Sequence, residues 1–279
     1  MKITKIKKHC GSYVEFDNPM DFFNYDITYW RNFLYSEKLI IFKKMTFSKL
    51  DYAKFSWHFG YPWKENDYSY SREYLEIIKD TDDREYIISP FSNIIVPRIK
   101  NTILPWHADI PNRQMRPYPS RSLWMVKNPN PTFSGKTSWL NIEDGINYLD
   151  DNLRELSKRI IIKQQSWYEP GTDIQFHNFL KVHPITGKIS LRLNTYGLKA
   201  WILETYVDNK LQSNELIQEY INYLLKFDDL ICEHTWDNFD IALYDNYSFI
   251  HSRSQINVEN LDDKERKFYR INIDHQKPI

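Results

Sequence analysis

The sequence predicts an α+β fold that is mainly β, with a double-stranded β-helix (jelly roll) core and flanking helices. Many short runs of β-branched and aromatic residues are separated by turn residues, which is typical of a β-sandwich or barrel. Strands and helices do not alternate regularly, so a parallel βαβ sheet is not expected. The 279 residues contain no repeat and no linker-like segment, and we therefore expect one domain over residues 1–279.

The first sixty residues predict two helices around one buried strand. Aromatic residues at helical spacing predict a helix over residues 21–36, and the apolar run 39–42 predicts a strand. Ser48 is a good N-cap with Asp51 three residues later, and Gly60 ends the second helix. The polar, Tyr-rich residues 64–85 indicate a loop or a short surface helix.

The remainder of the chain is dominated by short strands. Two further helices are predicted over residues 143–160 and 214–226, the second amphipathic and N-capped by Ser213. The predicted strands cover residues 86–89, 93–98, 101–110, 121–127, 136–142, 160–167, 179–183, 188–194, 200–206, 230–235, 239–244, 247–252 and 267–274.

Composition excludes several classes of protein. Lys+Arg and Asp+Glu both number 37, so the net charge is zero and we expect no nucleic-acid partner. Seven glycines leave no phosphate-binding loop, and no apolar stretch is long enough to span a membrane. No signal peptide is recognisable. Cys10 and Cys232 form neither a disulfide framework nor a metal-binding spacing, so we expect a reduced, cytoplasmic setting.

One predicted strand carries a candidate metal site. His107 and Asp109 in Trp106-His107-Ala108-Asp109 project to the same side of a strand, at a separation that suits chelation of one ion. A surface histidine beside a solvated aspartate is the alternative. His251 follows the segment 240–246 and lies 144 residues after His107, so only folding could bring the two together. A histidine with a purely structural role is the alternative there.

Two other segments carry candidate anion-binding groups. If the segment 265–273 is a strand, Tyr269, Ile271 and Ile273 fall on one face, and Arg266, Phe268, Arg270 and Asn272 fall on the other. The two arginines then need either solvent or anionic partners. Thr137 shares a strand face with Trp139 and Asn141, and its hydroxyl could complete the binding of a carboxylate held by an arginine.

In this order the segments resemble the TauD/TfdA-like family of Fe(II)- and 2-oxoglutarate-dependent dioxygenases, with its taurine dioxygenase, clavaminate synthase and carbapenem synthase branches. The resemblance covers nearly the whole chain. The matching blocks are the strand 39–42 with the helix ending in Phe59-Gly60, Trp106–Asp109 (WHxD), Gly135–Trp139 (GGxTxW, with Ser134 for the first glycine), His183–Gly187 with Leu191 and Asn194 (HPxTGxxxLxxN), Asp240–His251 (DxxxxDNxxxxxH) and Arg266 with Arg270.

The resemblance implies roles for these residues. His107, Asp109 and His251 would be the catalytic iron ligands, a 2-His-1-carboxylate facial triad that leaves positions for 2-oxoglutarate and O2. Arg266 would bind the C5 carboxylate of 2-oxoglutarate with help from Thr137, and Arg270 would face its C1 carboxylate or an anionic substrate.

Three features qualify the resemblance. The interval from His251 to Arg266 is longer than the family's usual one, so the loop 252–264 is expected to be longer here. If the alignment shifts, Arg253 competes for a role in anchoring the substrate. The residues after Gly60 lack the histidine that a taurine enzyme would use, which argues against taurine. Asp109 is present, which argues against halogenation.

The implied reaction is oxidative decarboxylation of 2-oxoglutarate to succinate, coupled to hydroxylation or desaturation of a small molecule. Epimerisation and cyclisation begin in the same way. Candidate substrate-binding residues are Tyr68, Tyr70, Arg98 and Arg192. An inward Arg192 would suit a carboxylate-bearing substrate, such as an amino acid or a secondary-metabolite precursor; an outward, solvated Arg192 is the alternative.

Other readings of the same residues stay open. A zinc hydrolase could use the same His/Asp/His cluster, but it leaves Thr137, Arg266 and Arg270 without a role. A non-catalytic jelly-roll binding module is the second alternative, and a nucleic-acid dioxygenase lacks a basic stripe to support it. A homo-oligomer and a substrate tethered to a carrier protein are also compatible with the sequence.

Overall fold

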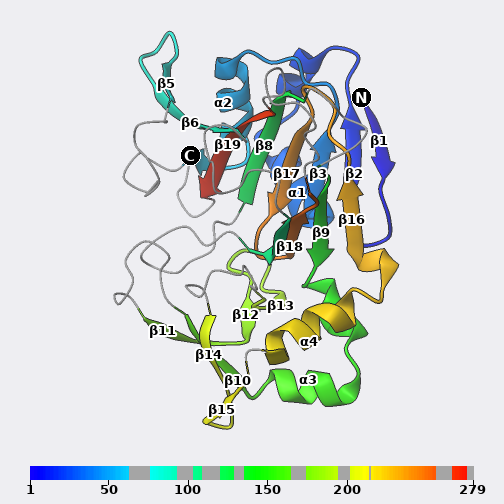
Figure 1. Ribbon diagram of the computed structural model, residues 1–279. Helices are drawn as coiled ribbons and strands as arrows, with labels where there is room; N and C mark the ends of the chain where they lie inside the picture. Colours follow the sequence, from blue (N-terminus) through cyan, green and yellow to red (C-terminus); the bar gives the residue numbers. More distant parts are fainter. Residues whose placement is uncertain are drawn as a thin grey trace.

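The computed structural model describes residues 1–62, 76–92, 103–108, 120–128, 135–164, 174–193, 202–213, 215–255 and 266–274. It has the predicted mainly β architecture (Figure 1). Its strands are β1 (Lys2–Lys5), β2 (Ser12–Glu15), β3 (Leu39–Phe42), β4 (Tyr61–Pro62), β5 (Glu76–Lys79), β6 (Glu85–Ser92), β7 (Leu104–His107), β8 (Ser120–Lys127), β9 (Thr137–Asn141), β10 (Ile160–Gln164), β11 (Gln175–Asn178), β12 (Leu180–Val182), β13 (Ile189–Leu191), β14 (Ile202–Val207), β15 (Lys210–Gln212), β16 (Ile231–His234), β17 (Ile241–Asp245), β18 (Phe249–Arg253) and β19 (Lys267–Asp274). Its α-helices are α1 (Ile27–Glu37), α2 (Lys49–Trp57), α3 (Asp151–Ser157) and α4 (Glu215–Leu224), with 3-10 turns at Pro19–Asn24, Asp144–Tyr148 and Asp228–Leu230.

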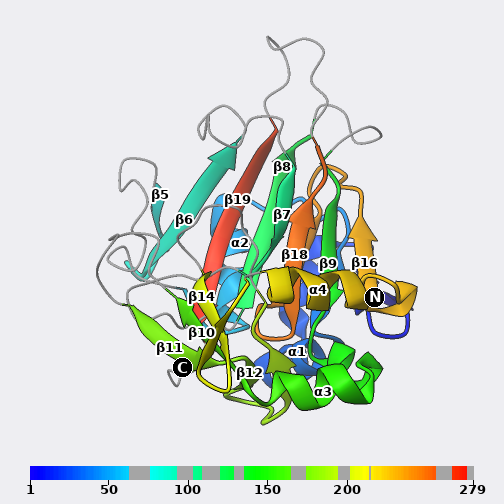
Figure 2. The same cartoon turned by 60° about the horizontal axis from the view of Figure 1, so that its bottom comes forward.

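Two sheets form the jelly-roll core. Within the described residues, the larger sheet has the strand order β1-β2-β3-β17-β8-β19-β6-β5, and β4 pairs with β19. The smaller sheet has the order β16-β9-β18-β7 and is antiparallel throughout. Figure 2 shows β7, β18, β9 and β16 side by side. The β10–β15 strands, α3 and α4 lie together at the lower end of Figure 1.

Strand alternation divides the apolar residues into three layers. On β3, for example, Leu39 and Ile41 face the space between the two sheets, whereas Ile40 and Phe42 face α1 and α2. The layer between the sheets also contains Trp139 of β9 and Phe268 of β19. The third layer packs the outer side of the smaller sheet against α4 and β10. A candidate site residue on β9 or β18 therefore faces either the larger sheet or the layer that contains α4 and β10.

Several element boundaries differ from the sequence-based expectation. The segment 64–85 was expected to be loop or helix, but Glu76–Lys79 forms β5 and pairs with β6; alternation over four residues is too short a signal to see in advance. The helix expected over 143–160 is interrupted, because Asp150 caps α3 and accepts a hydrogen bond from the Leu153 amide. The helix expected over 21–36 is likewise split, with Asp26 capping α1.

Other expectations are confirmed. Ser48 and Asp51 form a capping box at the start of α2, and the Ser213 hydroxyl accepts a hydrogen bond from the Glu215 amide before α4. The expected strand 267–274 coincides with β19. The expected strand 93–98 lies outside the described residues, and the short strands β1, β2, β11 and β15 were not predicted. No helix in the described part of the chain is long and apolar enough to span a membrane.

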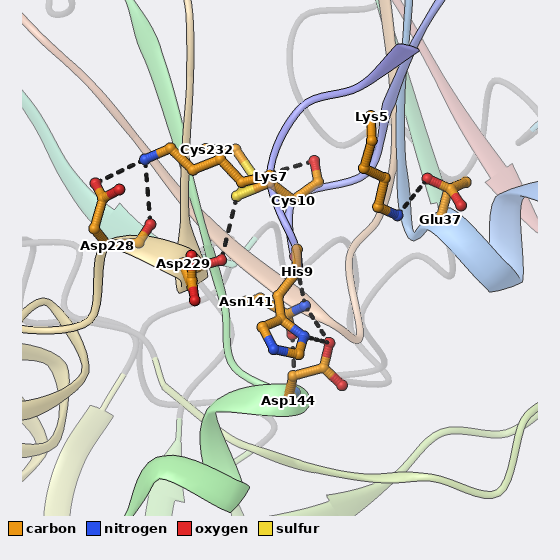
Figure 3. Close-up of a disulfide and its surroundings, with 10 residues drawn as sticks. All are labelled: Lys5, Lys7, His9, Cys10, Glu37, Asn141, Asp144, Asp228, Asp229 and Cys232. Carbon is orange, nitrogen blue, oxygen red and sulfur yellow. Dashed lines mark hydrogen bonds and ion pairs between the residues drawn. A yellow bond between two sulfur atoms is a disulfide. The ribbon is translucent and has the colours of Figure 1, made fainter. Parts of the chain in front are cut away.

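The two cysteines are paired, which the sequence did not indicate. Cys10, in the turn between β1 and β2, forms a disulfide with Cys232 on β16, and their Cα atoms lie 5.3 Å apart (Figure 3). Both residues are buried in the layer between the sheets. A single pair separated by 222 residues has no spacing signature, so only the folded chain reveals it.

Candidate active site

Two of the three predicted iron ligands meet on neighbouring strands. His107 at the end of β7 stands opposite His251 on β18, and the centroids of their rings lie 4.2 Å apart. Each side chain is 8% exposed. His251 also stands opposite Trp139 of β9, which places it on the side of the smaller sheet that faces the larger one. The smaller sheet thus brings together two imidazoles that are 144 residues apart in sequence.

A backbone contact sets the orientation of His107. Its Nδ1 lies 2.7 Å from the carbonyl oxygen of Pro105, so Nδ1 carries the proton and donates it. The tautomer follows from this contact, because a carbonyl oxygen can only accept. Nε2 is then the unprotonated nitrogen, which is the state a metal ligand requires.

Four predicted site residues cannot be placed. Asp109, Arg98, Tyr68 and Tyr70 lie outside the described residues. Ala108, which directly follows His107, is described and buried. The roles expected of these four residues, one as a metal ligand and three in substrate binding, therefore stay predictions.

The predicted cosubstrate residues gather at one end of β9 and β18. Thr137 stands opposite Arg253 in the pairing of these strands. Arg266 is buried and donates from Nη2 to the carbonyl oxygen of Gly135, two residues before Thr137, at 2.7 Å. Thr137 lies diagonally across from His251, a separation of about 7–8 Å between backbones. A threonine hydroxyl and two guanidinium groups therefore gather at one end of the strand pair that also carries His251.

The electrostatics of this cluster favour an anion. Burial, together with the neighbouring Arg253, lowers the pKa of Arg266 to about 9. The guanidinium keeps its charge at neutral pH, so its burial and its repulsion by Arg253 both destabilise the folded protein. A bound carboxylate would offset that cost through charge-assisted hydrogen bonds.

Arg270 occupies a neighbouring position on β19. The strand alternates as predicted: Phe268 packs in the layer between the sheets, whereas Tyr269 and Ile271 pack against the α1–α2 side. Arg270 shares the side of Phe268. Its Nη2 lies 3.4 Å from the Ser89 hydroxyl of β6. Arg270 is thus on the same side of the larger sheet as Arg266, four residues further along the chain.

Arg192 belongs to a second group of cations. It directly follows β13, is half-buried, and donates from Nε to the Asn178 carbonyl at 3.4 Å. This side chain is therefore partly shielded from solvent, and its role in binding a substrate stays a prediction. Lys181 of β12 is 6% exposed, and its ammonium lies 5.4 Å from the centroid of the Tyr247 ring. Burial and the nearby Arg192 lower the pKa of Lys181 to about 7, despite the opposing effect of Asp245 and Glu143.

The turn before β18 is fixed by the segment His183–Gly187. The amides of Ile185 and Thr186 both donate to Nδ1 of His183, at 3.1 Å. Nε2 therefore carries the proton of the neutral ring and donates it to Asp245 at 2.9 Å. Ser248 donates to the same carboxylate oxygen at 2.7 Å. The residues that begin β18 are thus held to the β12–β13 ribbon by buried hydrogen bonds.

Comparison with protein families decides the identity of the fold. Residues 2–272 match the model of the family described as "Taurine catabolism dioxygenase TauD, TfdA family". The chain belongs to this family. It is accordingly a dioxygenase that depends on Fe(II), 2-oxoglutarate and O2 and acts on a small molecule. No curated protein matches the sequence.

Solved structures share the fold of this TauD/TfdA-family chain. A taurine dioxygenase from Burkholderia xenovorans has a TM-score of 0.69 at 17% identity, covering 100% of this chain and 90% of its own. A structure named AAD-2, in complex with Mn(II) and N-oxalylglycine, has a TM-score of 0.67 at 14% identity, covering 99% of this chain and 98% of its own. At these identities the likeness establishes the jelly-roll fold and not the substrate.

The residues of the TauD/TfdA-family site fit the cofactors. The paired His107 and His251 offer nitrogen ligands that suit Fe(II), and the Pro105 carbonyl fixes one tautomer. Arg266, with Arg253 and Thr137 beside it, suits a dicarboxylate such as 2-oxoglutarate. Sequence reasoning missed Lys181 and assigned no role to Trp236, because both depend on contacts between distant strands.

Proposed function

We propose that His107, Asp109 and His251 hold the iron of this dioxygenase and that Arg266 and Thr137 bind the C5 carboxylate of 2-oxoglutarate. The observation that carries the proposal is the pairing of His107 with His251 beside a buried arginine and Thr137. Arg253 adds positive charge at the same end, and Arg270 faces the C1 carboxylate or the substrate.

Each group in the proposed site has a defined task. When bound, Fe(II) and 2-oxoglutarate supply the oxidative decarboxylation to succinate that drives cleavage of a substrate C–H bond. His107 and His251 would each supply one unprotonated ring nitrogen to the metal. Arg266 and Thr137 fix the far end of 2-oxoglutarate, so its other end is presented to the histidines in one orientation.

The test of the metal and cosubstrate site is anaerobic. Fe(II) and then 2-oxoglutarate are added to the purified protein, and the visible metal-to-cosubstrate charge-transfer band is recorded. We expect the band in the native protein and its loss in His107→Ala and His251→Ala. His177→Ala is the matched control, since His177 lies on β11, in a different sheet from β7 and β18. A folded protein that never gives the band would contradict the proposal.

The substrate is proposed to carry a carboxylate. Lys181 and Arg192 lie on the ribbon that contacts the Tyr247 turn, where the Ser190 hydroxyl donates to the Tyr247 carbonyl at 2.8 Å. Tyr247 precedes His251 by four residues, which is about 13 Å along an extended chain. A buried lysine and a half-buried arginine at that range suit the anionic end of an amino acid or a small carboxylic acid. Hydroxylation or desaturation of such a substrate is the reaction we propose.

A panel of amino acids and small carboxylates tests the substrate class through stimulated O2 consumption. We expect a carboxylate to stimulate the native enzyme and Arg192→Leu to raise its KM by tenfold or more. Arg159→Leu is the control, because Arg159 forms an exposed pair with Asp208. Equal stimulation by a carboxylate and by its neutral amide would refute the assignment.

A further inference from the structure

The Thr137 hydroxyl has a buried partner outside the predicted motifs. Trp236, which follows β16, donates from Nε1 to Thr137 Oγ1 at 2.9 Å. Trp236 is 1% exposed and Thr137 7%. The contact depends on pairing between distant strands, since His234 of β16 stands opposite Thr137 of β9.

The chemistry of a hydroxyl gives this contact a direction. A threonine hydroxyl has one proton to donate and two lone pairs that accept, whereas an indole N–H can only donate. Trp236 therefore occupies a lone pair of Thr137 and leaves the hydroxyl proton for another acceptor. Within the described part of the chain, Thr137 Oγ1 donates to no protein group. A carboxylate oxygen held by Arg266 would be a suitable acceptor.

Trp236 also supports the arginine side of the same cluster. Its ring meets the ring of Phe268 edge-on, with centroids 4.9 Å apart. The Arg266 guanidinium lies over the ring of Phe268, 4.9 Å from its centroid. One buried indole thus contacts Thr137 directly and Arg266 through a single intervening ring.

We infer that Trp236 is a positioning residue for the cosubstrate: its indole N–H orients the Thr137 hydroxyl to donate to the distal carboxylate of 2-oxoglutarate. The inference rests on the proposed function, in which Thr137 and Arg266 bind that carboxylate. Trp236 itself touches neither the metal nor the reacting atoms, and so it acts on binding of the cosubstrate.

The test compares Kd values for 2-oxoglutarate, taken from anaerobic titration of the charge-transfer band with Fe(II) present. Trp236→Phe keeps an aromatic ring and removes the N–H, and we expect Kd to rise about two- to tenfold, the effect of one hydrogen bond. The matched control is Trp124→Phe. Trp124 is also buried, but its indole nitrogen has no hydrogen-bond partner in the described residues and it packs on the α1–α2 side of the larger sheet. Its Kd should be unchanged.

A double-mutant cycle separates positioning from packing. Once Thr137→Val has removed the hydroxyl, adding Trp236→Phe should not raise Kd further. Additive effects of the two changes would show that Trp236 acts only by packing, and an unchanged Kd in Trp236→Phe would refute the inference. If the native protein itself gives no charge-transfer band, the proposed function fails, which is a different outcome from either of these.

Discussion

At the scale of single residues, Lys181 lowers stability at a position where we propose that the substrate binds. Its ammonium is buried beside the Tyr247 ring, and burial together with Arg192 lowers its pKa to about 7. The unfolded chain, where the lysine has an ordinary pKa, binds this proton more tightly than the folded protein does. Below pH 7 the folded protein therefore carries the full cost of a buried charge. Residues that are kept at such a cost are common at binding sites.

We predict that Lys181→Met raises the free energy of unfolding at pH 6 by about 2–4 kcal/mol. Between pH 7 and pH 10 the native protein gains stability relative to the variant, because the folded state has already lost the proton that the unfolded state still holds. The difference should therefore shrink as pH rises. Urea unfolding at several pH values measures it, with the exposed Lys210→Met as control. If substrate binding is unimpaired in the stabilised variant, the proposed role of Lys181 in binding is wrong.

The same scale shows what sequence can and cannot reveal about the site. His107 and Arg266 stand in recognisable motifs, and the strand pattern assigned Arg266, Phe268 and Arg270 to one face. Trp236 and Lys181 stand in no such motif. Trp236 meets Thr137 because of the register between β16 and β9, and Lys181 meets Tyr247 because the β12–β13 ribbon contacts the turn before β18. Neither contact can be read from the spacing of residues along the chain.

At the scale of elements, the turn that leads into β18 depends on one carboxylate. Burial alone would raise the pKa of Asp245, but hydrogen bonds from His183 and Ser248 outweigh it, so the pKa is lowered. One of its oxygens accepts from both of these side chains, and the other accepts from the Tyr247 amide. Both carboxylate oxygens thus accept hydrogen bonds, three in all among the described residues, and these bonds hold the start of the strand that carries His251.

We predict that Asp245→Asn lowers the free energy of unfolding at pH 7 by about 3 kcal/mol, because one carboxylate oxygen becomes an NH2 group that faces donors. The stabilisation by Asp245 is fully present above the ordinary aspartate pKa. It is lost as pH falls through the lowered pKa of the folded state, so the two proteins should converge below about pH 4. Chemical denaturation from pH 7 to pH 3 gives the comparison. Asp208→Asn, which alters an exposed ion pair, should change little at any pH.

Elements also differ in how well the sequence specifies them. The amphipathic α4 and the alternating β19 each bury one face, and both were predicted close to their observed bounds. The strand β5 has four residues and no strong period, and it exists because β6 offers a pairing edge. The helix over 143–160 was predicted as one unit because apolar spacing continues through Leu149, whereas the Asp150 cap starts a new helix.

At the scale of the whole molecule, the disulfide joins the N-terminal turn to the sheet that carries the site. Cys10 and Cys232 lie in the same apolar layer as Trp139 and Trp236. The Lys7 ammonium pairs with Asp228 at 2.7 Å next to the disulfide, which adds a second link between the two chain segments (Figure 3). The N-terminal strands are therefore fastened to β16, the strand that precedes Trp236.

We predict that the disulfide contributes about 2–5 kcal/mol to stability, since it closes a loop that spans most of the chain. Native protein should show no free thiol when denatured without reductant, and its melting temperature should fall on addition of dithiothreitol. The double variant Cys10→Ser/Cys232→Ser should melt at the lower temperature with or without reductant. Because the surrounding layer is apolar and closely packed, the variant should still fold and still give the charge-transfer band. Two free thiols in the denatured native protein would instead support the reduced, cytoplasmic setting that the cysteine count predicted, and the pairing would then be a close contact of two buried thiols rather than a bond.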